Sequence, residues 1–135
     1  MCQIKHMKYV CLALLSATLF CSCEGETTWI KQIDNQSNFD VTVSYYDSYS
    51  SEDASKVVDA HTTEIIFYGE KRGGDDTPLD CLEYLDDLEV VLDSGAVLTK
   101  DINDSGNWER EISEKNLGGV VNQTCSFSIE NDDFE

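Results

Sequence analysis

Hydrophobic and polar residues alternate with a period of two in several parts of the chain. From 39 to 46 the odd positions are apolar, and similar alternation recurs around 88–93 and 124–130. Side chains of a β-strand point in turn to the two faces of a sheet, so each segment is expected to be a strand with one buried face. In the last segment this places Cys125 and Phe127 toward a core.

Other strands are indicated by residue type and by turn residues. The run Ile65-Ile66-Phe67-Tyr68 is too short for a buried helix and rich in β-formers, so 63–68 is expected to be a strand covered on both faces. Asp93-Ser94-Gly95 supplies turn chemistry and predicts a hairpin whose second strand is 96–100. Weaker strand candidates are 29–34, 56–59 and 108–113.

One segment departs from the strand pattern. Thr77-Pro78-Leu79-Asp80 places a hydroxyl at a helix N-cap, proline at the first helical position and a carboxylate at the third. Leu79, Leu82 and Leu85 follow at a spacing of three. A short helix is therefore expected near 78–86.

The number and spacing of these elements favour an all-β domain. About eight short strands over roughly 105 residues predict a compact antiparallel β-sandwich, with a small barrel as the alternative. The chain shows no internal repeat, so one domain is expected at 29–130, after a tether at 23–28. The acidic tail at 131–135 is expected to hang free apart from Phe134.

Residues 1–22 differ from the rest and predict a secretion signal. A basic start containing Lys5 and Lys8 precedes an apolar stretch at 9–20, which is typical of a signal peptide. Twelve helical residues span roughly 18 Å against the ~30 Å of a bilayer's hydrocarbon layer. A transmembrane helix is therefore the weaker interpretation.

The signal ends in Phe20-Cys21-Ser22-Cys23, where the sequence resembles bacterial lipoproteins. In that family a small residue precedes a cysteine that is acylated and becomes the first residue of the mature chain. Ser22 fits the small position before Cys23, whereas Phe20 and Cys21 depart from the usual residues. Such departures are common in lipoproteins of the Bacteroidetes, which the chain resembles most. An ordinary cleaved signal with an incidental cysteine is the alternative.

Two further stretches are similar to small Bacteroidetes lipoproteins with sandwich domains. They are Ile33-Asp34-Asn35-Gln36-Ser37 near the start of the domain and Phe127-Ser128-Ile129-Glu130 near its end. The resemblance implies an envelope protein held at the outer membrane by acyl chains such as palmitate, facing the periplasm or the cell surface. The family has no assigned catalytic residues to carry over.

Charge narrows the class of partner. The chain has 9 Lys plus Arg against 27 Asp plus Glu, a formal net charge of −18. Nucleic-acid binding is disfavoured because it needs a basic surface. Anionic lipid surfaces also repel such a domain, so contact with the membrane would depend on the acyl chains.

Only Cys81 and Cys125 remain once the signal is removed and Cys23 is acylated. An exported pair can oxidise, and the bond would close a loop of about 45 residues and stabilise the fold by about 4 kcal/mol in the chain-entropy model. Two separate buried thiols are the alternative, since a sequence does not place Cα atoms within bridging distance.

No catalytic motif stands out, so neither an enzymatic activity nor a cofactor is predicted. His61 is the one histidine after the signal, and a lone histidine at a strand start is more often structural than catalytic. Adjacent carboxylates such as Asp86 and Asp87 are expected to point to opposite faces of a strand. Such a pair could not act on one substrate.

A calcium loop is the sharpest local motif. Asp101, Asn103 and Ser105, followed by Gly106, match the first, third, fifth and sixth positions of such a loop. Ile112 stands where a bidentate glutamate is required. A turn between two strands is therefore the favoured interpretation, and no metal is predicted.

The leading hypothesis is a non-enzymatic, lipid-anchored envelope domain with a binding or assembly role. Tyr45, Tyr46 and Tyr49 lie near a serine-rich loop and are the candidate contact surface for a protein or glycan ligand. A core edge beside an ordinary loop is the alternative for these tyrosines. The rival hypothesis is an acidic inhibitor or immunity-type lipoprotein whose negative field captures a cationic enzyme.

Overall fold

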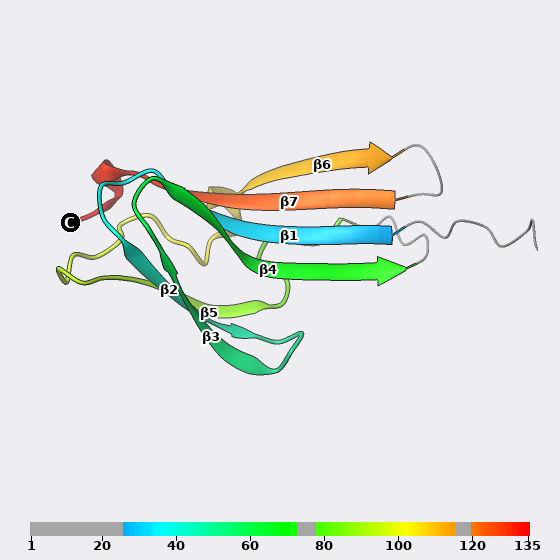
Figure 1. The fold of residues 1–135 in the computed structure, drawn as a ribbon, viewed down its shortest axis with the longest axis horizontal. Helices are drawn as coiled ribbons and strands as arrows, with labels where there is room; N and C mark the ends of the chain where they lie inside the picture. The colour runs from blue at the N-terminus through cyan, green and yellow to red at the C-terminus, as the bar shows by residue number, and fades with distance from the viewer. Residues whose placement is uncertain (1–25, 73–77, 116–119) are drawn as a thin grey trace, which may run out of the picture.

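The computed structural model describes residues 26–72, 78–115 and 120–135. Seven strands in these ranges form two sheets, in agreement with the predicted all-β sandwich (Figure 1). The two sheets do not close into a barrel. The expected signal, Cys23 and Thr77 lie outside the described residues.

The larger sheet has four strands in the order β4-β1-β7-β6. β1 pairs with β4 in antiparallel and with β7 in parallel orientation, so the sandwich is not purely antiparallel. The first and last strands of the domain are therefore neighbours in the middle of this sheet. The strands are β1 (Glu26–Asn35), β4 (Thr62–Arg72), β6 (Glu109–Lys115) and β7 (Val120–Ile129).

The smaller sheet has three antiparallel strands in the order β3-β2-β5. In Figure 1 it lies below the larger sheet, and the chain passes from one sheet to the other between β3 and β4. Its strands are β2 (Val41–Asp47), β3 (Glu52–Val58) and β5 (Leu85–Leu92).

The core forms where the alternating apolar positions of the two sheets meet. Phe127 and Ile129 of β7 are fully buried, and Val41 and Val43 of β2 are buried on the facing sheet. This confirms the two-residue period predicted for both segments. Phe39, predicted to share the buried face of β2, lies before the strand and is exposed.

β4 does not have two covered faces, contrary to the prediction. Ile66 and Phe67 are buried, whereas Ile65 and Tyr68 are exposed. Next to Lys31 of β1 the pairing shifts by one residue and leaves Ile66 as an extra residue on β4. Such a bulge lets consecutive side chains point to the same side. The continuous apolar run therefore reflects a bulge rather than a strand with both faces buried.

The helix predicted near 78–86 is absent. Residues 81–84 form turns, and β5 already begins at Leu85. The Asp80 carboxylate accepts a hydrogen bond from the backbone amide of Leu82, which is a local bond that competes with helix formation. Tyr84 then takes a left-handed backbone conformation with φ 68°, which a right-handed helix does not allow.

The segment after β5 returns without becoming a strand. Isolated bridges join Val97 to Val91 and Leu98 to Phe134. Val97 and Glu135 also exchange two backbone hydrogen bonds. The predicted hairpin is therefore reduced to a single bridge, and the C-terminal tail is tied to this segment instead of hanging free.

Cys81 and Cys125 form a disulfide bond, with Cα atoms 5.6 Å apart. Cys125 lies on β7 of the larger sheet, and Cys81 lies in the turn that precedes β5 of the smaller one. Both residues are buried. Of the two alternatives left open by the sequence, the bonded pair is the one present, and it fixes the turn against the larger sheet.

Candidate functional site

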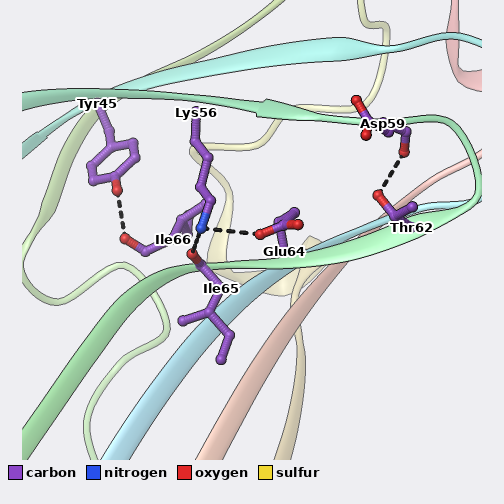
Figure 2. Close-up of polar contacts among 7 residues, drawn as sticks. All are labelled: Tyr45, Lys56, Asp59, Thr62, Glu64, Ile65 and Ile66. Carbon is purple, nitrogen blue, oxygen red and sulfur yellow. Dashed lines mark hydrogen bonds and ion pairs between the residues drawn. The ribbon is translucent and has the colours of Figure 1, made fainter.

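The fold separates the three tyrosines that were predicted to share a contact surface. Tyr45 is buried, and its hydroxyl donates a hydrogen bond to the backbone carbonyl of Ile66 (Figure 2). Tyr49 is exposed, but its ring packs edge-on against Phe67. Of the three, Tyr46 alone lies on the solvent face of β2.

Tyr46 has a carboxylate on each side. Its cross-strand partners are Asp53 of β3 and Asp86 of β5. Directly opposed residues in antiparallel strands have Cβ atoms about 4.5–5.5 Å apart, so both carboxylates can reach a cation bound over the tyrosine ring. A shallow depression at this point is lined by Ser44, Tyr46, Asp53, Ser55 and Asp87 among others.

A bulge in β5 adds a third carboxylate. Opposite the stretch 44–46 of β2, β5 carries one extra residue, and Asp87 has a left-handed φ of 53°. Asp86 and Asp87 are therefore both exposed, between the buried Leu85 and Leu88. The prediction that these adjacent carboxylates point to opposite faces is wrong, because it assumed a regular strand.

One row of the same face is apolar. Thr42 pairs with Val57 on one side and with Val91 on the other, and Val91 is bridged to Val97. Paired residues share a face, so these side chains form a row across the sheet. The three valines are 57%, 46% and 66% exposed. Scattered surface valines need no explanation, but a contiguous row is a candidate contact surface.

A third row lies between the valines and Tyr46. Ser44 pairs with Ser55 and Glu89, and the two serine hydroxyls lie 3.3 Å apart. We call the surface made by the three rows the Tyr46 face. It comprises Thr42, Ser44, Tyr46, Asp53, Ser55, Val57, Asp86, Asp87, Glu89, Val91 and Val97. It thus combines four carboxylates with exposed valine and tyrosine side chains, and none of these residues is basic.

Lys31 is a buried amine on the inner face of β1. The residue is 1% exposed, its ammonium donates a hydrogen bond to the Glu83 carbonyl, and Nζ lies 4.9 Å from the centroid of the Phe67 ring. Burial lowers the pKa of Lys31 to about 8, although nearby carboxylates oppose this shift. Perturbed amines often mark functional sites. The contacts of Lys31 are structural, because they hold the turn before β5 against the larger sheet.

Two other lysines also make contacts within the domain. Lys56 Nζ lies 3.0 Å from the Glu64 carboxylate and donates a hydrogen bond to the Ile65 carbonyl (Figure 2). Lys100 donates a hydrogen bond to the Ser128 carbonyl. These contacts point the two ammonium groups toward β4 and β7. The carboxylates of the Tyr46 face are therefore not neutralised by them.

The residues of the candidate calcium loop bond to the backbone around them. The Asn103 side chain exchanges two hydrogen bonds with the backbone of Leu88, and the Asp101 carboxylate accepts from the Asn103 amide. Ser105 begins a short 3-10 helix, Ser105–Asn107, that Asp104 caps. Among the described residues, no group of three or more His, Cys, Asp or Glu side chains is arranged to hold a metal ion.

His61 lies in the turn between β3 and β4. It is exposed, has a left-handed φ of 61°, and its Nε2 lies 3.0 Å from the side-chain oxygen of Asn38. The contact joins this turn to the turn between β1 and β2. The partner of His61 is therefore the neutral side-chain amide of Asn38, and the contact lies between two turns.

Comparisons with known proteins add no family to this picture. No protein-family model, no curated protein and no solved structure matches the chain. In the part of the chain that the structure describes, no helix is long and apolar enough to cross a membrane. The findings define a small all-β domain of two sheets with an internal disulfide.

Proposed function

We propose that this chain is an exported, lipid-anchored envelope protein, similar to small lipoproteins of the Bacteroidetes, with a non-enzymatic binding or assembly role. The observation that carries this proposal is the disulfide between Cys81 and Cys125. Such bonds form and persist in oxidising compartments outside the cytoplasm. Export is also what the basic and apolar pattern of residues 1–22 predicts.

Attachment at Cys23 would hold the domain close to the membrane. β1 begins at Glu26, so two residues separate Cys23 from the first strand. Figure 1 shows that β1 starts at the end of the larger sheet where β4 ends, and that the C-terminus lies at the opposite end. Anchoring at the start of β1 would leave the outer faces of both sheets open to proteins in the same compartment.

The Tyr46 face supports binding as the role of the anchored domain. Protein contact surfaces are enriched in tyrosine and combine apolar contacts with a polar rim. On the Tyr46 face the valine row supplies the apolar contact, and Tyr46 lies between Asp53 and Asp86. A protein ligand fits this extended surface better than a small molecule, because small-molecule sites are enclosed and largely apolar.

Mass spectrometry of the protein extracted from cell membranes tests the anchor and the disulfide together. We expect a mature N-terminal Cys23 that carries acyl chains, and a linked peptide containing Cys81 and Cys125. In the C23A variant the acylated N-terminus should be absent, whereas the C21A control should keep it. Intact, unmodified protein in the cytosolic fraction would overturn the proposal.

An acidic inhibitor of a cationic enzyme is a second candidate function. It is favoured by the carboxylates of the Tyr46 face, which neither Lys56 nor Lys100 neutralises. Capture by a negative field weakens as salt screens the charges. Inhibition of a basic lysozyme should therefore decline as ionic strength rises from 20 to 500 mM. Inhibition that ignores salt would exclude capture by a negative field, and absence of inhibition would exclude a basic lysozyme as the target.

A further inference from the structure

We propose that the Tyr46 face is the docking surface for a basic protein segment in extended conformation, which presents apolar side chains to the valine row and a Lys or Arg to Tyr46. This inference rests on the binding role proposed above and adds the chemistry of the partner. It follows from the position of the apolar row, from the carboxylates around Tyr46 and from the distance between them.

The apolar half of the contact is the valine row. Val57 and Val91 flank Thr42 in register on the outer face of the smaller sheet, Val97 is bridged to Val91, and each valine is about half exposed or more. Thr42 completes the row with its methyl group. A partner that covers this row removes a continuous strip of apolar surface from water, which is the main favourable term in protein association.

The charged half of the contact surrounds Tyr46. Asp53 and Asp86 are its direct cross-strand partners, and Asp87 lines the same depression. An aromatic ring attracts a cation over its face, and flanking carboxylates add charge-assisted hydrogen bonds. A guanidinium or ammonium group is therefore the chemical group that fits this position.

The distance between the valine row and Tyr46 is fixed by β2. Thr42 and Tyr46 are four residues apart on β2, which corresponds to about 13 Å in an antiparallel strand. An extended partner segment has the same repeat. Its apolar residue and its Lys or Arg should therefore also be four residues apart, on the same side of the strand.

Charge selects this partner over the other occupants of such a face. A second copy of the chain would bring like carboxylates together, because each copy carries a formal charge of −18. An anionic lipid surface would be repelled for the same reason. A basic polypeptide gains both from the apolar row and from the carboxylates.

Binding of a designed peptide tests the inference. The probe is a β-hairpin peptide. On one face it carries two neighbouring valines at one end, and an arginine four residues along the strand from one of these valines. The control peptide has the same composition, with the arginine moved next to the valines. We expect the extracted protein to bind the probe about tenfold more tightly than the control, and NMR shifts to map to the Tyr46 face.

Matched variants separate docking from general charge attraction. D53N/D86N and V57S/V91S should each weaken probe binding about tenfold. E70Q/E111Q removes the same charge as D53N/D86N from the outer face of the larger sheet and should leave binding nearly unchanged. Equal loss in both charge variants, shifts mapped elsewhere, or no preference for the probe would overturn the proposal.

Sedimentation and vesicle binding test the competing occupants. Concentration-dependent dimers lost in V57S/V91S would assign the face to a second copy, and binding to anionic vesicles lost in the same variant would assign it to lipid. Either result overturns the proposal. The peptide assay is scored whether or not Cys23 carries acyl chains, so failure of the anchor and failure of docking are distinguished.

Discussion

The hydroxyl of Tyr45 on β2 donates a hydrogen bond to the carbonyl of Ile66, the extra residue in the β4 bulge. The bond joins the two sheets at the point where the regular pairing of β1 and β4 is interrupted. A bulge leaves backbone groups outside the ladder, and a buried carbonyl without a donor is costly. Tyr45, on the opposite sheet, therefore supplies the hydrogen-bond donor for the carbonyl of the extra residue in the bulge.

Replacing Tyr45 by phenylalanine should remove this donor and leave the ring in place. We expect a loss of about 1–3 kcal/mol in the free energy of unfolding, because the Ile66 carbonyl stays buried without its partner. Y46F is the matched control, since that hydroxyl lies on the solvent face, and it should change stability by less than about 0.5 kcal/mol. Urea denaturation of both variants measures the difference, and equal values would contradict the prediction.

Removal of the disulfide should lower stability without changing the strand order. C81S/C125S is expected to lose about 2–5 kcal/mol, mainly because the unfolded chain is no longer cross-linked. Melting temperatures with and without dithiothreitol provide the measurement. Reductant should lower the melting temperature of the native protein and leave that of the variant unchanged. An equal response in both would mean that the bond is absent from the folded protein.

Lys31 should make the protein more stable as pH rises above about 8. Burial lowers its pKa from 10.5 to about 8, so in this interval the unfolded state binds more protons than the folded state. Stability then increases with pH, by at most about 3 kcal/mol over the whole interval. In K31M this rise should be absent.

The effect of Lys31 on the free energy of unfolding should be measured between pH 8 and 9.5. Burial, followed by the charge of Asp47, raises the pKa of Tyr45, so its folded state holds the proton longer than the unfolded state. That difference makes stability fall as pH rises above about 10. Urea denaturation of the native protein and K31M inside the lower window isolates the amine, and parallel stability curves would refute its assignment.

Lys56 should contribute to stability through the Ile65 carbonyl more than through its ion pair with Glu64. Both side chains of the pair are partly exposed, and exposed ion pairs contribute about 0–1 kcal/mol. E64Q should therefore be almost neutral, whereas K56M should cost about 1 kcal/mol more, because it also removes the exposed hydrogen bond to the Ile65 carbonyl. Chemical denaturation in 0.05 and 0.5 M NaCl distinguishes the two terms. A larger loss in E64Q than in K56M would reverse the assignment.

Much of the fold follows from local alternation. The period-two pattern around Val41 and Phe127 depends on which side of a strand meets the core, and a sequence displays this directly. β1 was a weaker candidate because Lys31 occupies a core position between Trp29 and Ile33, all on one buried face. A buried lysine looks like a surface residue until its acceptor and the surrounding rings are known.

The two bulges could not be placed in the same way. The extra residues at Ile66 and Asp87 are defined by the register between strands that are distant in sequence. Leu85 and Leu88, which flank the second bulge, are also three residues apart, but the prediction places Leu85 in a helix with Leu79 and Leu82 and places Leu88 in the following strand. The spacing of three is shared by a short helix and by a strand with one inserted residue, so it does not decide between them.

The candidate site was predicted in part. Tyr46 was included, but alternation within 45–46 already implies that neighbouring tyrosines lie on opposite faces. Val57, Val91 and Val97 were missed because valines within or beside strands are ordinarily assigned to the core. Their exposure becomes visible only when Thr42 is seen to pair with valine on both sides.

The pairing of β1 with β7 has a consequence for biogenesis. Residues 28–35 pair with residues 122–129. The middle of the larger sheet therefore cannot assemble before nearly the whole polypeptide is present. Contacts between such distant segments also form slowly. The middle of the larger sheet therefore forms only after the last strand is available, which is compatible with the export proposed above.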